Sequence, residues 1–190
     1  MLEKILQWDQ DIFIYFNGLG IEKFDSFWIV ATNIFTWLPL FILFFVLISL
    51  KFPKKQVFFI TLTVAALVFF IIFSSNVVKE LVERLRPNNN EEINTFIRIL
   101  KRPSSYSFFS GHSSSSVSIT TIIVLFLRRK IKWVWIFYLW PLLFAYSRIY
   151  VGVHYPIDLF VGALVGIGAA FMFYVLYKKF ILPYLTLTRP

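Results

Sequence analysis

The sequence lacks cysteine altogether, which excludes disulfide bonds, a thiol nucleophile and a cysteine-ligated metal site. Histidine is scarce, with two residues in 190, and charged residues make up 15% of the chain, against about a quarter in an ordinary soluble domain. Two histidines without cysteine or a dense group of carboxylates make a poor site for zinc or magnesium. We therefore expect no metal ion and no cofactor.

Hydrophobic residues dominate what is present. They make up 58% of the chain, aromatic residues make up 21%, and the mean hydropathy is +0.74. A soluble core of this size would not need 24 phenylalanines, so the composition indicates that lipid is the solvent. The net charge of +9 would suggest a nucleic-acid partner for a soluble protein, but in a membrane protein the distribution of charge matters more, and we expect no such partner.

Uncharged stretches of the length that a bilayer requires, about 20 residues, recur along the chain. We predict an all-α integral membrane protein with five transmembrane helices, over residues 26–50, 56–78, 108–127, 133–153 and 157–177. Residues 1–24 predict an amphipathic helix at the membrane interface. The polar segment 79–107 predicts a partly helical outer loop, with 94–100 as its candidate helix. No repeat or linker divides the chain, so residues 1–190 are predicted to form a single domain.

Basic residues gather on one side of such a five-span chain. Ten basic residues and no acidic residue fall there: Lys51, Lys54, Lys55, Arg128, Arg129, Lys130, Lys132, Lys178, Lys179 and Arg189. The other side carries the remaining nine basic and all ten acidic residues. Short loops rich in Lys and Arg stay in the cytoplasm. The pattern therefore predicts a multi-pass protein of the cytoplasmic (inner) membrane, whose N-terminal helix and polar loop face the periplasm or the exterior.

The first polar cluster on the outer side contains Lys79 and Arg86-Pro87. If the second span continues past its apolar part, Lys79 and Arg86 are seven residues apart on one helix face, and Pro87 ends the helix. Two such cations can bind a dianionic phosphate. A basic helix end at the membrane surface is the alternative, and this segment alone favours neither interpretation.

The second cluster is Ser110-Gly111-His112, which precedes four further serines. Glycine at a helix start lets the backbone approach an anion, and the free N–H groups there bind phosphate. His112 can then donate a proton to a departing oxygen. The alternative is a serine-rich helix cap with an interfacial histidine, which this segment alone slightly favours.

The third cluster contains Arg148, His154 and Asp158. Pro156 suits the first turn of a helix. Asp158, four residues after His154, can accept the Nδ1 proton of the imidazole and leave Nε2 for nucleophilic attack. Arg148 adds a third cation. A helix-capping aspartate beside a histidine is the alternative. Since both histidines, three cations and one carboxylate fall on the same side, together they form an inventory for phosphoryl transfer without metal.

The spacing of these clusters resembles the three-part signature of the type 2 phosphatidic acid phosphatase family, which shares its site with vanadium haloperoxidases. Six residues separate Lys79 from Arg86-Pro87, five separate Arg148 from His154, and three separate His154 from Asp158. The resemblance implies that His154 forms a phosphohistidine, that Asp158 orients it and that His112 protonates the leaving group. It also implies phosphate binding by Lys79, Arg86, Ser110, Gly111 and Arg148.

Two features depart from the family pattern. Phe109 stands where the family usually has proline before Ser-Gly-His, which bears on the shape of the loop and removes no catalytic atom. Many relatives have six spans, and an interfacial N-terminal helix in place of the first span would explain the difference. Close packing within the chain, rather than dimerisation, is expected of the small residues Gly162, Ala163, Gly166, Gly168, Ala169 and Ala170.

The function expected from these observations is hydrolysis of a phosphate ester or pyrophosphate on a membrane lipid. Family analogy favours undecaprenyl pyrophosphate, with phosphatidylglycerol phosphate, phosphatidic acid and lipid A 1-phosphate as alternatives. A non-enzymatic lipid-binding or transport protein on the same fold is an alternative from another class. It should have lost the nucleophile or its partners, yet His154, Asp158 and His112 are all present. A metal-dependent phosphatase is a third option, which the residue inventory argues against.

Overall fold

The computed structural model describes residues 1–187, and Arg189 lies outside the described residues. The described chain is helical and contains no strand, which confirms the all-α prediction. The α-helices are α1 (Leu2–Gly18), α2 (Asp25–Ala31), α3 (Leu38–Lys51), α4 (Lys54–Val82), α5 (Gly111–Leu127), α6 (Leu139–Tyr150), α7 (Pro156–Leu176) and α8 (Leu182–Leu187). Between them lie the 3-10 helices η1 (Glu22–Phe24), η2 (Ile34–Trp37), η3 (Pro87–Asn89) and η4 (Val134–Tyr138), and the π-helical segment η5 (Tyr177–Ile181).

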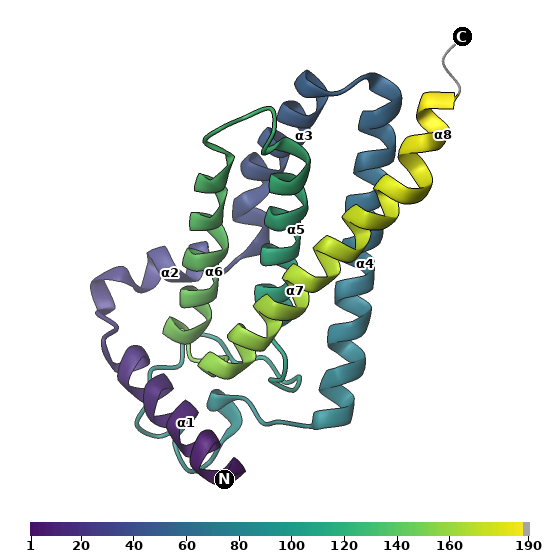
Figure 1. Ribbon diagram of the computed structural model, residues 1–190. Coiled ribbons are helices and arrows are strands. Elements are labelled where there is room, and N and C mark those ends of the chain that lie inside the picture. The colour runs from purple at the N-terminus through teal and green to yellow at the C-terminus, as the bar shows by residue number, and fades with distance from the viewer. Residues whose placement is uncertain (188–190) are drawn as a thin grey trace.

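The helices α3 to α7 form a bundle in which successive helices run in opposite directions (Figure 1). The connections from α4 to α5 and from α6 to α7 lie at the end that also holds α1, in the lower part of the view. The α3–α4 turn and the connection from α5 to η4 lie at the opposite end. Segments that are far apart in the sequence therefore meet beside α1.

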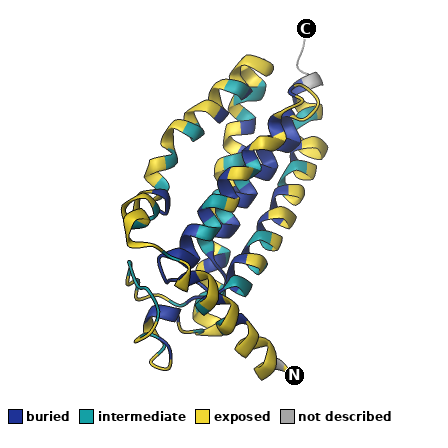
Figure 2. Cartoon of the chain, turned by 90° about the vertical axis from the view of Figure 1, so that its left-hand side faces the viewer, coloured by how far each residue is buried: buried dark blue, intermediate teal, exposed yellow. Residues whose placement is uncertain are grey.

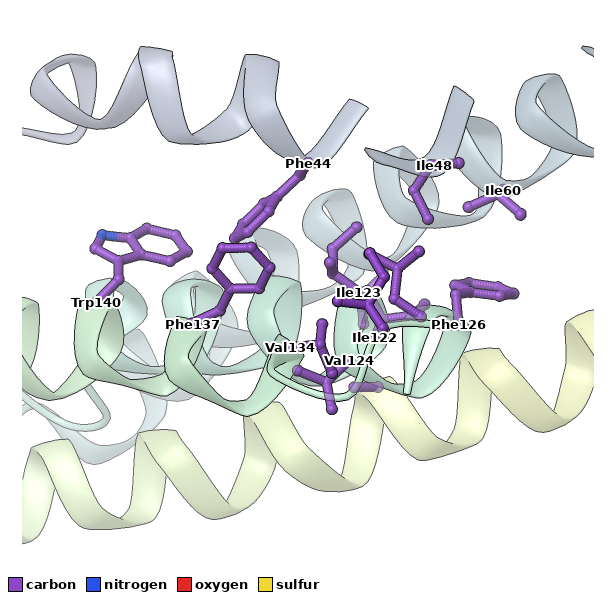
Figure 3. Close-up of a cluster of buried hydrophobic side chains, with 14 of the residues drawn as sticks. Phe44, Ile48, Ile60, Ile122, Ile123, Val124, Phe126, Val134, Phe137 and Trp140 are labelled. Atoms are coloured by element: carbon purple, nitrogen blue, oxygen red, sulfur yellow. The ribbon is translucent and has the colours of Figure 1, made fainter. Parts of the chain in front are cut away.

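Helix α5 is the centre of the bundle, in contact with α3, α4, α6 and α7. Its side chains are buried on nearly every face, whereas the outer helices bury one face only (Figure 2). The core beside it joins α3 to η4, where the rings of Phe44 and Phe137 meet edge to face at 4.8 Å, and Ile122 and Ile123 of α5 pack nearby (Figure 3). The first half of α5 consists mainly of small serine and threonine side chains and the second half of apolar ones, so the helix can be surrounded by other helices along its length.

Glycines let α7 approach the first turns of α5. A Cβ atom on Gly162 would lie 2.7 Å from the carbonyl oxygen of Ser110, and one on Gly166 would lie 2.5 Å from that of Ser114. No side chain fits into these distances, so the two helix backbones touch. The expected packing within the chain is confirmed at these two positions. At Gly168 it is wrong, because no neighbouring atom lies within 4 Å of a Cβ placed there.

Three helical segments are long and apolar enough to cross a membrane: Ile34–Lys51, Lys54–Asn89 and Pro156–Leu185. At most 28% of the apolar window of each is buried inside the protein, and large side chains such as Phe69, Phe73 and Phe160 stay exposed. Apolar surface on this scale is unfavourable in water and suits contact with lipid.

The predicted first span, residues 26–50, is interrupted. Helix α2 ends at Ala31, and the apolar helix starts only at Ile34. The cause is Asn33, whose side chain accepts a hydrogen bond from the backbone N–H of Phe35 at 3.1 Å and so caps a new helix. Asparagine competes for backbone hydrogen bonds in this way.

Two local predictions in the outer segment are wrong. Helix α4 ends at Val82, and Glu83 takes the left-handed conformation with φ of 52°, so Lys79 and Arg86 do not share a helix face. Residues 94–100 form turns rather than a helix. The N–H of Arg98 donates to the side chain of Asn17 at 2.7 Å, so tertiary contacts replace a helical hydrogen bond there.

Candidate active site

His154 lies in the short connection between α6 and α7 and is completely buried. Its Nδ1 atom is 3.4 Å from Oδ2 of Asp158, which sits in the first turn of α7. The N–H of Tyr155 donates to the same carboxylate oxygen at 3.0 Å, closing a capping box. The carboxylate therefore lies beside Nδ1, as the i, i+4 spacing predicted.

The other ring nitrogen of His154 faces Arg86, whose Nη1 atom is 2.9 Å from Nε2. Arginine can only donate, so Nε2 carries no proton and accepts this hydrogen bond. The same guanidinium donates to the carbonyl oxygens of Val153 at 2.9 Å and Ser105 at 2.6 Å. Arg86 is thus fixed beside the ring nitrogen that a phosphorus atom would approach, although it reaches this place from the loop after α4 and not from the helix.

Burial lowers the pKa of His154 well below its ordinary value, and the positive charges of Arg86, Arg148, Lys79 and Arg84 lower it further. The imidazole is therefore neutral at pH 7. A neutral imidazole with its Nδ1 proton directed at a carboxylate is the nucleophilic form of histidine.

The Ser110-Gly111-His112 segment begins α5. The hydroxyl of Ser110 caps the helix by accepting from the N–H of Ser113 at 3.3 Å. The N–H of Ser110 donates to the carbonyl of Asp158 at 3.0 Å, which joins the start of α5 to the start of α7. A Cβ atom on Gly111 would lie 3.8 Å from the ammonium nitrogen of Lys79, so that cation lies beside the helix start. The arrangement is one that can bind an anion.

The second histidine, His112, packs its ring against Phe144 with 5.5 Å between centroids. It lines the same cavity as Arg148 and lies within the range of electrostatic interaction with the ring of His154. The structure thus brings the two histidines to one end of the bundle, around one group of cations.

Arg148, near the end of α6, is 5% exposed and donates to the hydroxyl of Thr32 at 2.6 Å. Its Nε atom has no hydrogen-bond partner among the described residues. A cavity of about 430 Å³ lies beside it, lined by Thr32, Asn33, Ile34, Lys101, Arg102, Pro103, His112 and Arg148. The basic residues that line this cavity and the unsatisfied Nε atom of Arg148 suit an anionic ligand.

The structure gathers all eight candidate residues at the end of the bundle that carries α1: Lys79, Arg86, Ser110, Gly111, His112, Arg148, His154 and Asp158. In residues 1–187, no group of three or more His, Asp or Glu side chains is placed to share a metal ion. The site consists of cations, two imidazoles and one carboxylate.

The sequence interpretation missed Arg84 and Asp9. The Arg84 guanidinium bridges Oδ1 of Asp158 and Oδ2 of Asp9, each at 2.7 Å. Asp9, from α1, is 2% exposed and also accepts from the N–H of Ile157 at 2.8 Å. A hydroxyl hydrogen bond from Ser107 completes the surroundings of Asp158. One signal could have revealed Asp9: an acid on the apolar face of an amphipathic helix, four residues before the buried Phe13.

Comparison with known proteins gives consistent matches. The family model described as PAP2 superfamily matches residues 56–182. The chain is 28% identical over 184 residues to a lipid A 4'-phosphatase of Bacteroides thetaiotaomicron, covering 94% of this chain and 81% of that protein. It is 31% identical over 139 residues to an undecaprenyl-diphosphatase of Sulfolobus acidocaldarius, covering 73% and 62%.

Among solved structures, the transmembrane PAP2 type phosphatidylglycerolphosphate phosphatase of Bacillus subtilis has a similar fold. The TM-score is 0.73 with 22% identity, over 93% of this chain and 88% of that one.

Proposed function

The chain belongs to the PAP2 superfamily and is a membrane phosphatase that acts on lipid phosphates; on this premise we propose that it works without metal, through a phosphohistidine at His154. The observation that carries the proposal is the pair of contacts made by that imidazole. Asp158 lies beside Nδ1 and Arg86 lies beside Nε2, so the ring offers an unprotonated nitrogen toward a bound phosphate.

In the first step, Nε2 of His154 attacks phosphorus while the bond to the lipid oxygen breaks. Arg86, Arg148 and Lys79 neutralise the charge that spreads over the phosphoryl oxygens. His112 gives its proton to the departing oxygen, and the negative phosphate beside it favours the protonated imidazole that this requires. The lipid leaves, and the phosphoryl group stays on His154.

In the second step, water attacks the phosphohistidine. His112, now neutral, accepts a proton from that water, and the N–P bond breaks to release inorganic phosphate. Asp158 stays ionised, accepts a hydrogen bond from the Nδ1–H of His154 throughout, and stabilises the positive charge on the ring while the ring carries the phosphoryl group.

Chelation separates this mechanism from a metal-dependent one. We expect the purified protein to release phosphate from lipid phosphates in excess EDTA at its full rate, because His154, His112 and the cations supply the nucleophile, the acid and the charge neutralisation. Orthovanadate should inhibit, since it can bind His154 as a five-coordinate mimic of the transition state. Phosphate release is the measurement. Loss of activity on chelation, restored by a divalent metal, would contradict the proposal.

We place the site on the outer side of the cytoplasmic membrane in a single five-span domain. The spans are α3, α4, α5, η4 with α6, and α7, and α1 lies at the outer interface. Support comes from the alternating directions of these helices and from the basic residues of the α3–α4 and α5–η4 connections, at the end opposite to the site (Figure 1).

Since the chain has no cysteine, single-cysteine labelling tests this orientation without background. Thr95 is exposed in the loop between α4 and α5, and Arg129 is exposed at the opposite end. Thr95→Cys should react with a membrane-impermeant maleimide on intact cells, and Arg129→Cys only after the cells are opened. The reverse pattern would overturn the orientation, and labelling of both residues on intact cells would overturn the spans.

For the substrate, we retain undecaprenyl pyrophosphate, which the similarity to an undecaprenyl-diphosphatase supports. A lipid A phosphate is the second candidate, favoured by the relative that matches 94% of this chain. The two candidates have different leaving groups: a lipid monophosphate leaves from undecaprenyl pyrophosphate, and an alcohol leaves from a lipid A phosphate. The cavity contains basic residues outside the family signature that can distinguish these leaving groups.

A further inference from the structure

Two cations on the cavity wall have no role in the proposed reaction. Lys101 and Arg102 follow each other in the loop between α4 and α5, and both line the cavity together with His112 and Arg148. Within residues 1–187 neither side chain makes a hydrogen bond or an ion pair, while every other arginine facing the site is held by a partner. Two adjacent cations without a partner in the described chain, in the wall of a cavity that suits phosphate, indicate that this part of the cavity binds an anion.

The backbone that carries these cations is fixed. The N–H of Leu100 donates to the carbonyl of Val151 at 3.1 Å, three residues before the nucleophile. The carbonyl of Pro103 accepts from the side-chain amides of Asn88 at 3.4 Å and Asn89 at 3.3 Å. The dipeptide is therefore tied on both sides to the segments that hold His154 and Arg86.

The charges of the cavity repel one another in the free protein. Partial burial lowers the pKa of Lys101, and the positive charge of Arg148 lowers it further. No acidic side chain is among the residues that line the cavity. An anion placed between Lys101 and Arg148 would relieve this repulsion, so the cavity is complementary to more negative charge than one phosphoryl group beside His154 carries.

The position of the two cations indicates which part of a substrate they meet. In the proposed reaction, the phosphoryl group under attack lies beside Nε2 of His154 and the guanidinium of Arg86, and the departing oxygen lies toward His112. Lys101 and Arg102 share the cavity wall with His112, on the leaving-group side. The leaving group of a lipid monophosphate ester is an uncharged alcohol. The leaving group of a lipid diphosphate is a lipid monophosphate, which is negatively charged.

We infer that Lys101 and Arg102 form a subsite for the lipid-linked phosphoryl group of a diphosphate substrate. The inference rests on the proposed function. His154 attacks the terminal phosphorus, the bond from that phosphorus to the bridging oxygen breaks, and the bridging oxygen takes the electron pair. The product that leaves is a lipid monophosphate, whose new negative charge Lys101 and Arg102 stabilise.

The test compares farnesyl diphosphate with farnesyl monophosphate in detergent micelles, for the full chain and for the double variant Lys101→Gln/Arg102→Gln. We expect kcat/KM for the diphosphate to fall roughly 30-fold or more, and for the monophosphate less than about threefold, because only the diphosphate reaches the subsite. The matched control is Lys4→Gln/Lys23→Gln, which removes the same charge from exposed positions at the same end of the protein. It should leave both values within about twofold.

A fall in kcat/KM of equal size for both substrates, or a comparable fall in the control variant, would contradict the subsite and would indicate a general electrostatic attraction of anions. No fall at all would show that the cations do not touch substrate. Binding of farnesyl methylenediphosphonate against farnesyl phosphonate keeps the inference testable apart from turnover. If neither substrate is hydrolysed but the double variant selectively loses binding of the diphosphonate, the proposed function is wrong and the subsite is supported. If hydrolysis occurs but the double variant shows no selective loss of diphosphonate binding, the subsite alone is wrong.

Discussion

Replacing His154 by alanine should lower phosphate release by roughly 10⁴-fold or more, to the level that binding and charge neutralisation alone provide. The imidazole is completely buried between Asp158 and Arg86, and no other described side chain offers a nitrogen in that position. The rate is measured with a lipid phosphate in micelles, and thermal unfolding shows whether the variant is folded.

Covalent labelling assigns the nucleophile independently of the rate. The chain has two histidines, so a phosphoryl label that is acid-labile and base-stable and is recovered as phosphohistidine after alkaline hydrolysis belongs to His154 or His112. We expect rapid quenching with radiolabelled aryl phosphate to label wild type and His112→Ala, because an aryl leaving group departs without a proton. His154→Ala should carry no label. A label that survives in His154→Ala and disappears in His112→Ala would reverse the two roles.

How far the sequence could anticipate this site depends on the range of each interaction. The His154–Asp158 contact lies within one helical turn, so its spacing predicted it. The helices of the bundle follow from runs of apolar residues in the same way, and their ends lie within a few residues of the predicted ones except at Asn33, where one side chain breaks the helix. Local pattern is sufficient for contacts of this kind.

The position of Arg86 shows where local pattern stops. A continuous helix would have placed it on one face with Lys79, but α4 ends early and Arg86 reaches His154 from an extended segment. The residues that hold it there, Ser105 and Val153, come from two distant segments. Periodicity along a single segment carries no information about such partners.

Asp9 is the clearest case of a contact beyond the reach of the sequence. It lies 149 positions before Asp158, and the two carboxylates meet only through Arg84. The position of Asp9 on the apolar face of α1 signals burial, and α1 does pack against α6 and α7, but the helix pattern does not identify Arg84 as the partner of this carboxylate. The N-terminal helix is therefore joined to the candidate active site by two ion pairs, in which both carboxylates are buried and the Arg84 guanidinium is partly buried.

Replacing Arg84 by methionine should lower kcat by roughly two orders of magnitude, with KM nearly unchanged. Loss of one partner of a buried ion pair costs about 3–5 kcal/mol, because the remaining charge stays buried without compensation. Arg84 holds two such carboxylates, and one of them is the carboxylate beside His154. It does not line the cavity beside Arg148, so substrate binding should survive while the orientation of the imidazole is lost. The measurements are kcat, KM and the thermal unfolding temperature.

A double variant separates positioning from folding. Burial raises the pKa of Asp9, and the N–H of Ile157 and Arg84 oppose that shift. Without Arg84, Asp9 keeps one hydrogen-bond donor, the N–H of Ile157, whereas Asp158 keeps the hydroxyl of Ser107 and the N–H of Tyr155. Adding Asp9→Asn to Arg84→Met should restore much of the unfolding temperature, because one uncompensated charge is removed. It should not restore kcat, because Asp158 still lacks the guanidinium that fixes it. The matched control adds Asp11→Asn, a substitution two residues away on the same helix, where the carboxylate is exposed and accepts a hydrogen bond from Gln7. This control should restore neither quantity. Recovery of kcat together with stability in the Asp9 variant would mean that Arg84 only holds the fold together, and the role in positioning Asp158 would be abandoned.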